Sequence, residues 1–265
     1  MKNKCFFKII IPVYNCEKYI EKCIKSIENQ TFQDFSIVII DDVSTDNSPT
    51  IIKNLCNQYS NVISLFIHNK VWNGGARNIG INTKINSQYT LFIDSDDWLS
   101  SNDCLEYLYN LIKENNYPDC IRMNYNLLKD KQLKEVKFLE KELSPQKLLK
   151  SLSVAVWTKC VKTELVTYFP EETLMEDEIQ HISQCDNIEN VILCKKPIIT
   201  WNRDNVNSCS TMDKKTNPLY DKWNSSIYRF LADLIDLKCK HNYCEEYRLQ
   251  RIKQIKNIIK ETIDE

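Results

Sequence analysis

Apolar residues recur along the first hundred positions with two alternating periods. Mainly apolar runs of four to eight residues, bounded by polar turns, are typical of buried strands. They occupy residues 6–13, 36–40, 62–67 and 89–93. Between them apolar residues return every three or four positions, as at Ile20, Cys23, Ile24 and Ile27, which predicts amphipathic helices. Strands alternating with helices at this spacing predict right-handed βαβ units and a mostly parallel sheet.

The remaining chain continues the alternation less regularly. A helix over 105–112, a strand over 119–125, a short helix from Ser144 and a helix opening at Met175 precede two closing strands, 191–194 and 198–201. Residues 129–143 are charged and weakly patterned, so no structure is predicted there. From about Asn217 onward the pattern is wholly helical, with two amphipathic helices.

Polar residues follow the expected strands at the points where those strands end. They are Tyr14, Asp41, Asp42, Asp94, Asp96 and Asp97. In parallel sheets, ligands bind beyond the carboxyl ends of the strands, so these side chains are expected at one edge. Carboxylates one residue apart can hold a hard divalent cation, which in turn holds a phosphate. The alternative for residues 94–97 is an acidic turn after a core strand.

Local backbone signals predict two further features near these strand ends. Asn15 is a plausible N-cap for the helix after the first strand. The chain has only three glycines, and all of them lie between Gly74 and Gly80. Such clustering predicts a backbone that turns tightly or approaches something closely, leading into a helix that starts near Arg77.

Composition excludes some classes of protein. The 265 residues are 43% hydrophobic and 27% charged, as in soluble globular proteins, and the formal net charge is −1. No overall positive field exists to attract phosphate backbones, which argues against nucleic acid as a partner. The N-terminal stretch lacks a signal-peptide cleavage pattern, and no segment is apolar enough for a membrane helix, so a cytoplasmic protein is expected.

Twelve cysteines are scattered through the chain without a C-x-x-C pair. Their apolar neighbours suit small buried side chains in a reducing compartment. Cys239, His241 and Cys244 make up half of a zinc site, but no second pair of ligands lies nearby in the sequence, so zinc is not predicted.

Four segments together resemble family-two glycosyltransferases. These are residues 9–15 (IIIPVYN), 41–46 (DDVSTD), 76–80 (ARNIG) and 94–97 (DSDD), in that order. The resemblance is dense over residues 5–100 and looser to about 210. It implies a GT-A fold, which is an α/β architecture with a Rossmann-like, mostly parallel sheet flanked by helices. Residues 1–100 would form the nucleotide-sugar half, 101–210 the acceptor-side half, and 211–265 a helical C-terminal extension.

The resemblance also implies roles for residues that bind the nucleotide. Pro12 and Tyr14 would border the base, with Tyr14 stacking or packing on it. Asp42 would accept a hydrogen bond from the imide N–H of the base, which favours uracil. Arg77 would lie near the donor phosphates or order the acidic loop.

A second group of implied roles concerns the diphosphate and the reaction. Asp94 and Asp96 would form the D-x-D pair, with Asp96 the direct ligand of Mg²⁺ or Mn²⁺ and Ser95 among the donor-binding residues. Arg203 resembles the late basic segment that closes over the diphosphate. Asp177, in the later acidic pair, matches the general base, and its alternative role is a first-turn helix carboxylate.

These residues imply one reaction. A divalent ion and an arginine stabilise a nucleoside diphosphate leaving group, and a carboxylate takes the proton of the acceptor hydroxyl. The expected function is inverting, metal-dependent transfer of a hexosyl or related sugar from a UDP-sugar to a glycan or lipid-linked glycan. Bacterial surface polysaccharide synthesis (capsule, lipooligosaccharide or O-antigen) is the expectation at the level of the family.

Four neighbouring residues keep structural or open readings. Trp157 and Lys159 resemble an acceptor-side segment, and the alternative is a buried indole beside a surface lysine. His181 is expected to be structural. Glu178 is taken as a neighbour of the base.

Three alternative functions stay open. An aspartyl-phosphate phosphatase would need a hydroxyl where Trp98 stands. A nucleotidyltransferase usually carries a glycine-rich basic loop near its N-terminus, which this chain lacks. A non-catalytic sugar-nucleotide-binding or scaffold subunit is disfavoured because Asp96 and Asp177 are present.

The last helix bears basic residues beside an apolar stripe. They are Arg248, Arg251, Lys253, Lys256 and Lys260. The preferred interpretation is a helical pair packed on the catalytic domain or on a second subunit, as in a homodimer. The other is peripheral contact with an anionic membrane surface.

Overall fold

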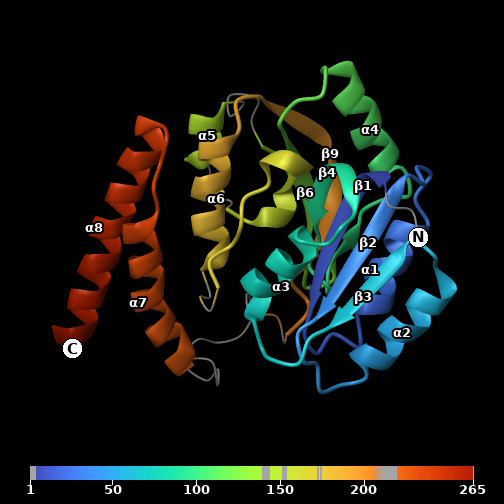
Figure 1. Cartoon of the computed structure of the whole chain (residues 1–265), viewed down its shortest axis with the longest axis horizontal. Helices are drawn as coiled ribbons and strands as arrows, with labels where there is room; N and C mark the ends of the chain where they lie inside the picture. The colour runs from blue at the N-terminus through green and yellow to red at the C-terminus, as the bar shows by residue number, and fades with distance from the viewer. Residues whose placement is uncertain are drawn as a thin grey trace.

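One mixed sheet runs through the centre of the molecule (Figure 1). The computed structural model describes residues 4–138, 144–150, 154–171, 173, 175–206, 208 and 220–264. Within these residues nine strands join in the order β3-β2-β1-β4-β8-β6-β9-β5, and β7 pairs with β6. The strands are β1 (Lys4–Val13), β2 (Phe35–Asp41), β3 (Val62–Phe66), β4 (Asn86–Phe92), β5 (Trp98–Leu99), β6 (Cys120–Lys129), β7 (Gln132–Val136), β8 (Lys159–Lys162) and β9 (Val191–Asn202). The predicted α/β fold is confirmed.

The first half of the sheet is parallel, as the sequence predicts. Strand β1 pairs in parallel with β2 and β4, and β2 pairs in parallel with β3. Alternate residues of β1 point to opposite faces. Ile9 and Ile11 belong to the core under α1 (Ile20–Glu28), α2 (Ser48–Gln58) and α4 (Cys104–Glu114). Ile10 belongs to the core under α3 (Trp72–Ile81), so helices cover both faces.

The second half of the sheet differs from the expectation in two places. Residues 132–136, where no structure is predicted, form β7, which pairs antiparallel with β6. The two predicted closing strands are a single strand, β9, whose parallel register with β6 shifts around Asn124. That irregularity absorbs Lys195 and Lys196, which separate the two apolar runs.

Helix α3 corrects the expected glycine loop. It begins at Trp72 rather than near Arg77, so all three glycines are helical, and none has a positive φ. A Cβ on Gly80 would overlap Ile10 Cγ2 of β1 and lie 3.0 Å from Ile40 Cδ1 of β2. A Cβ on Gly74 would overlap the Pro170 carbonyl oxygen. The glycines therefore allow α3 to lie close to the sheet and to Pro170, so the predicted close approach is confirmed. The predicted tight turn at the glycines is wrong, because all three lie inside a helix.

Asn15 does not cap α1, which corrects a second expectation. The helix begins at Ile20, and the residue before it, Tyr19, makes no side-chain cap. Asn15 has a φ of 49°, and its Oδ1 accepts a hydrogen bond of 2.7 Å from the backbone N–H of Thr45. The amide thus ties the end of β1 to the turn after β2, which excludes a capping role.

The C-terminal helices pack on the rest of the chain. Helices α7 (Tyr220–Asp236) and α8 (Asn242–Asp264) share an apolar cluster with α5 (Pro145–Leu149) and α6 (Glu176–Asn187) (Figure 1). Its buried members include Leu148, Ile182, Phe230, Leu234 and Ile255. This arrangement matches a helical pair packed on the catalytic domain. The predicted boundary at residue 210 lies outside the described residues.

Two cations of the basic stripe on α8 are held by protein groups. Arg248 donates to Glu245 and to the Leu234 carbonyl oxygen, and Arg251 pairs with Glu178. Lys253, Lys256 and Lys260 are exposed. Among the described helices, none is long and apolar enough to cross a membrane.

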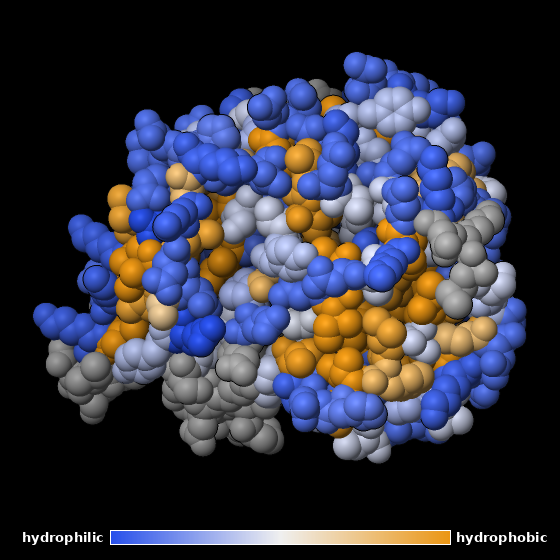
Figure 2. Space-filling model, in the orientation of Figure 1, coloured by the Kyte–Doolittle hydropathy of each residue, from blue (hydrophilic) through white to orange (hydrophobic). Residues whose placement is uncertain are grey.

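Figure 2 shows several apolar areas at the surface. One lies along the hairpin of α7 and α8. In these helices Tyr228, Ile235 and Leu249 are about half exposed. Another lies over α3 and the edge strand β3. In these elements Ile63 and Ile79 are only partly buried.

The half zinc site is occupied by protein contacts. His241 Nδ1 lies 2.9 Å from Asp186 Oδ1, which also accepts the backbone N–H of His241. No group of three or more His, Cys, Asp or Glu side chains arranged to hold a metal occurs in the described ranges.

Gly80→Ala tests the close approach of α3. In an unhindered helix this change raises the free energy of unfolding by about 1 kcal/mol. Here the methyl group meets Ile10 and Ile40, so we expect a loss of about 1–3 kcal/mol, measured by urea denaturation with circular dichroism. Asn73→Ala, at an exposed position of the same helix, is the control and should change stability by about 0.5 kcal/mol or less. A Gly80→Ala protein as stable as the wild type would contradict the packing.

Candidate active site

Arg77 joins the two halves of the chain. Its guanidinium donates through Nη2 to Asp94 Oδ1 at 2.8 Å, and through Nη1 to Glu176 Oε1 at 2.9 Å and Asp177 Oδ1 at 3.2 Å. Only 2% of the Arg77 side chain is exposed. Asp94 follows β4, whereas Glu176 and Asp177 open α6, so one buried cation brings the predicted D-x-D motif and the predicted base together.

Burial and charge act in opposite directions on this cluster. Burial alone would lower the pKa of Arg77, but Asp177, Asp94 and Glu176 outweigh it and the pKa is raised. Burial, followed by the neighbouring Asp177, raises the pKa of Glu176 to about 7. Burial likewise raises the pKa of Asp177, which Arg77 counteracts. Asp177 is therefore a carboxylate of increased basicity that stays a quarter exposed.

A backbone group also acts on Asp177. The backbone N–H of Val156 lowers the pKa of its carboxyl group, in the same direction as Arg77. Val156 starts a 3-10 turn, Val156–Thr158, immediately before β8. The charged form of the base candidate is thus stabilised by Arg77 and by the start of this turn.

Asp96 and Asp97, in the acidic loop after β4, differ in burial and in their hydrogen-bond partners. Asp97 is buried, and its Oδ1 accepts the backbone N–H of Asn202 in β9 at 2.8 Å, which ties the loop to the far side of the sheet. Asp96 is partly exposed and accepts from Asn205 Nδ2 at 2.7 Å. Burial and then the charge of Asp94 raise the pKa of Asp96.

The Asp94 and Asp96 pair suits a small divalent cation. Magnesium and manganese sites that bind phosphates commonly use one or two protein carboxylates and take the other ligands from the substrate and water. A cation between the two carboxylates would offset their mutual repulsion. The metal-ligand assignment stays a prediction, and these two residues fit it.

The predicted base-binding residues lie together at the end of β1. Tyr14 is half exposed, and Lys70 Nζ lies 2.9 Å from the centroid of its ring. The same ammonium lies 3.0 Å from Asp42 Oδ2. Both Asp42 oxygens already accept backbone hydrogen bonds, from Val71 at 2.8 Å and Trp72 at 2.9 Å. Asp42 thus anchors the start of α3, and its contact with a base stays a prediction.

Three other predicted site residues are placed as follows. Pro12 is buried in β1 opposite Ile40, so its side chain belongs to the sheet end below Tyr14. Ser95 is partly exposed between the two aspartates. Arg203 follows β9, and its guanidinium carbon lies 4.9 Å from the Trp201 ring centroid. The structure does not bring Arg203 into a described contact with Arg77 or Asp177.

A buried cation behind Asp177 was not expected from the sequence. Lys159 is 1% exposed, so the reading as a surface lysine is wrong. Its Nζ donates to the carbonyl oxygens of Val154 and Ala155 and to His181 Nδ1 at 3.2 Å. Since Nδ1 accepts, Nε2 of His181 donates to the Leu148 carbonyl oxygen at 3.1 Å. The two carbonyl oxygens and His181, which lies 22 residues away in the sequence, together satisfy the buried ammonium group.

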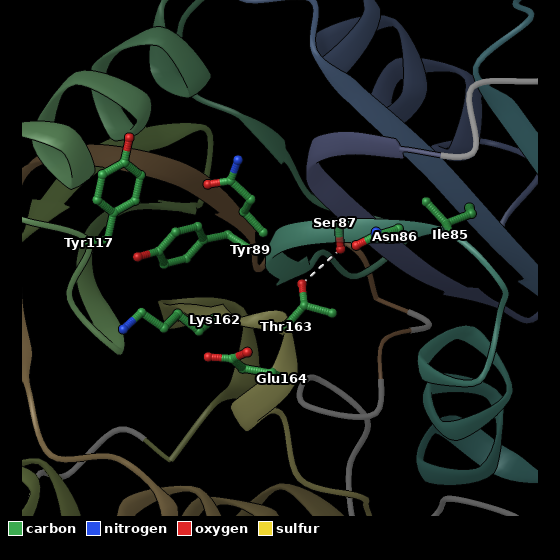
Figure 3. Close-up of a pocket in the computed structure, with 9 residues that line it drawn as sticks. Ile85, Asn86, Ser87, Tyr89, Tyr117, Lys162, Thr163 and Glu164 are labelled. Carbon is green, nitrogen blue, oxygen red and sulfur yellow. Dashed lines mark hydrogen bonds between the residues drawn. The ribbon is translucent and has the colours of Figure 1, made fainter.

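A separate hollow of about 500 Å³ lies at the other end of β4 (Figure 3). Its hydroxyls bond one another, with Ser87 Oγ 2.7 Å from Thr163 Oγ1, and Lys162 pairs with Asp119. Asp94 and Asp96 lie beyond the opposite, carboxyl end of the strand. The hollow is therefore distinct from the carboxylate site.

Comparison with known proteins decides the family. The sequence model of Glycosyl transferase family 2 matches residues 8–159, which is more than half of the chain. The chain belongs to glycosyltransferase family 2. The match ends at the buried Lys159, so Asp177 and the C-terminal hairpin lie beyond it.

Curated relatives of this glycosyltransferase are bacterial. The chain is 39% identical over 109 residues to glycosyltransferase GlyA of Streptococcus pneumoniae, which is 40% of this chain and 15% of that protein. It is 41% identical over 112 residues to a poly(ribitol-phosphate) beta-glucosyltransferase of Bacillus spizizenii, covering 40% and 17%. The matched part is thus well under half of those proteins.

Solved structures show the same fold. Residues 1–349 of TarS from Staphylococcus aureus, in complex with UDP-GlcNAc, superpose with a TM-score of 0.72 at 21% identity, covering 92% of this chain and 70% of that one. The mannosyltransferase PcManGT of Pyrobaculum calidifontis, with GDP-Man and Mn²⁺, gives 0.64 at 13% identity, covering 94% and 69%. These similarities confirm the GT-A fold.

The Lys159–His181 contact predicts a pH-dependent stability. Burial, and then the charges of Lys159 and Arg122, lower the pKa of His181 well below its usual value. Below about pH 6.5 the unfolded chain binds a proton at His181 that the folded chain does not bind. The free energy of unfolding therefore decreases as the pH is lowered. Between about pH 7 and 5 the wild type should lose about 2 kcal/mol more than His181→Gln, whose amide can still accept from Lys159 and donate to Leu148.

Urea denaturation at the two pH values measures this difference. The control is His68→Gln, at an exposed position, which should keep the pH dependence of the wild type. Equal losses in the wild type and in His181→Gln would show that His181 is protonated in the folded protein.

Proposed function

We propose that this family-2 glycosyltransferase is an inverting, metal-dependent enzyme. It would move a sugar from a UDP-sugar to a hydroxyl of a glycan or lipid-linked glycan in bacterial surface polysaccharide synthesis. The single observation that carries the proposal is the contact of Arg77 with Asp94 on one side and with Glu176 and Asp177 on the other. Through this contact, Arg77 binds both Asp94, which would lie beside the leaving group, and Asp177, the candidate base.

Asp177 has the properties of a general base. An acceptor hydroxyl is a weak nucleophile, so its proton must leave as the new glycosidic bond forms. The raised pKa of Asp177 makes the carboxylate a better proton acceptor, while Arg77 and Lys159 keep it ionised. One displacement with one base, on the face opposite the leaving group, inverts the anomeric carbon.

Asp94 and Asp96 would hold the divalent ion, which would neutralise the charge that develops on the departing nucleoside diphosphate. Arg77 would contribute indirectly to the departure of the diphosphate, by fixing the orientation of Asp94. It would keep its ion pairs with the carboxylates throughout. Arg203 would add positive charge from the end of β9.

The relatives support a donor and acceptor class. TarS is solved with UDP-GlcNAc and PcManGT with GDP-Man, which supports a nucleotide sugar here. Tyr14 and Asp42 at the end of β1 and β2 favour uracil among the bases. The poly(ribitol-phosphate) beta-glucosyltransferase relative supports a cell-surface polymer as the acceptor. We place the enzyme in the cytoplasm, where a nucleotide-sugar donor is available.

The second candidate is a non-catalytic subunit that binds a sugar nucleotide. A donor panel distinguishes the two. UDP- and GDP-linked sugars would be incubated with Mn²⁺ or Mg²⁺ and candidate glycan acceptors, and the products read by mass spectrometry. Metal-dependent release of UDP with a matching mass gain on the acceptor supports the enzyme. Binding of UDP without release, over the whole panel, supports the subunit.

Asp177→Asn tests the base assignment. The amide keeps the shape and can still lie beside Arg77, but it cannot take a proton. We expect transfer to fall by about 10²–10⁴-fold while the affinity for UDP and metal stays within about twofold. Asp34→Asn, an exposed position, is the matched control with wild-type transfer. Undiminished turnover of Asp177→Asn would end the assignment.

A further inference from the structure

The C-terminal hairpin is bonded to α6 at both ends of that helix. Near the start of α6, Arg251 of α8 forms a bidentate pair with Glu178, through Nε to Oε1 and through Nη2 to Oε2 at 2.9 Å. Near its end, Asp186 accepts the backbone N–H groups of Lys240 and His241, which lead into α8. We propose that Arg251, in helix α8 of the hairpin, is a positioning residue for Asp177. This inference rests on the proposed role of Asp177 as base.

The first turn of α6 places three carboxylates in a row. Arg77 binds Glu176 and Asp177 from the side of α3, and Arg251 binds Glu178 from the side of α8. Successive residues of a helix are rotated by about 100°, so these contacts point in different directions. Ion pairs on two sides of one turn fix the rotation of the helix about its own axis.

Apolar packing alone would not fix that rotation. Ile179, Ile182 and Cys185 of α6 belong to one apolar cluster with Phe230 and Leu234 of α7, and the Tyr243 hydroxyl of α8 donates to the Cys185 carbonyl oxygen at 3.1 Å near the end of α6. Apolar contacts are non-directional, whereas a bidentate arginine–carboxylate pair at the first turn has a defined geometry. Since a misplacement of about 1 Å can cost about 10²-fold in rate, a small roll of α6 would reach the reaction through Asp177.

Charge gives Arg251 a second effect on the site. Glu178 is 13% exposed, so its carboxylate is largely withdrawn from water and depends on Arg251 for compensation. Without the guanidinium, the negative charge of Glu178, one residue after Asp177 in the same helical turn, would have lost its partner. The pair therefore keeps the electrostatic environment of the base constant as well as its position.

A charge-swap series tests the inference. The variants are Arg251→Met, Glu178→Gln, the Arg251→Met/Glu178→Gln double variant, and the reversed pair Arg251→Glu/Glu178→Arg. Arg251→Met should lower kcat by about tenfold and leave the KM for the donor within about twofold, because the donor side of the site is untouched. The reversed pair should recover kcat to within about threefold of the wild type, and the double variant should be less impaired than the sum of its single changes.

Two controls separate positioning from folding. Arg229→Met removes a similar arginine pair, with Asp233 inside α7, that does not reach α6. It should leave kcat unchanged. Hydrogen exchange of the α6 amides should accelerate in Arg251→Met and not in Arg229→Met, at a temperature where both proteins are folded.

The outcomes distinguish this inference from the proposed function. If kcat of Arg251→Met is unchanged, or if it falls and the reversed pair does not recover it, the positioning role is wrong. If the wild type turns over no donor, the proposed function fails. Hydrogen exchange of the α6 amides then still reports whether Arg251 holds the helix in place. An unchanged exchange rate in Arg251→Met would show that it does not.

Discussion

A buried guanidinium bound to three carboxylates is the interaction on which the site depends. Removing Arg77 from water is costly, and its burial is tolerated because Asp94, Glu176 and Asp177 offer it charge-assisted hydrogen bonds. The dependence is mutual. Without Arg77 the three carboxylates would repel one another in a partly buried space. The segment after β4 and the start of α6 are thus held together by charge as well as by the sheet.

The glycines make that placement of Arg77 possible. Gly80 lets one end of α3 lie directly on Ile10 and Ile40 of the sheet, and Gly74 lets the other end approach the Pro170 carbonyl. Arg77 lies between them, one helical turn from each. A helix with larger residues at these positions would stand further from the sheet and from α6. The glycine cluster therefore acts through packing, by placing Arg77 against the sheet and α6.

Local patterns predict the first hundred residues well and the rest poorly. Strands such as β1 and β2 are apolar runs that depend on few distant contacts, and the acidic residues that close them lie where parallel strands end. The partners of Arg77 in α6 are 99 and 100 residues away in sequence, and no local pattern reveals such a pair. The burial of Lys159 likewise depends on His181. The start of α3 at Trp72 could not be predicted from the sequence, because glycines such as Gly74 and Gly75 usually argue against a helix.

The balance of charge supports the proposal that the site binds a cation. Around Asp177 and the D-x-D motif, the described carboxylates outnumber the nearby cations Arg77 and Lys159. These carboxylates are Asp94, Asp96, Asp97, Glu176 and Asp177. Several have a raised pKa, because burial and mutual repulsion disfavour their charged forms. A divalent ion at Asp94 and Asp96 would offset this repulsion where a bound diphosphate would add to it, and Arg77 would remain bound to the proposed base, Asp177.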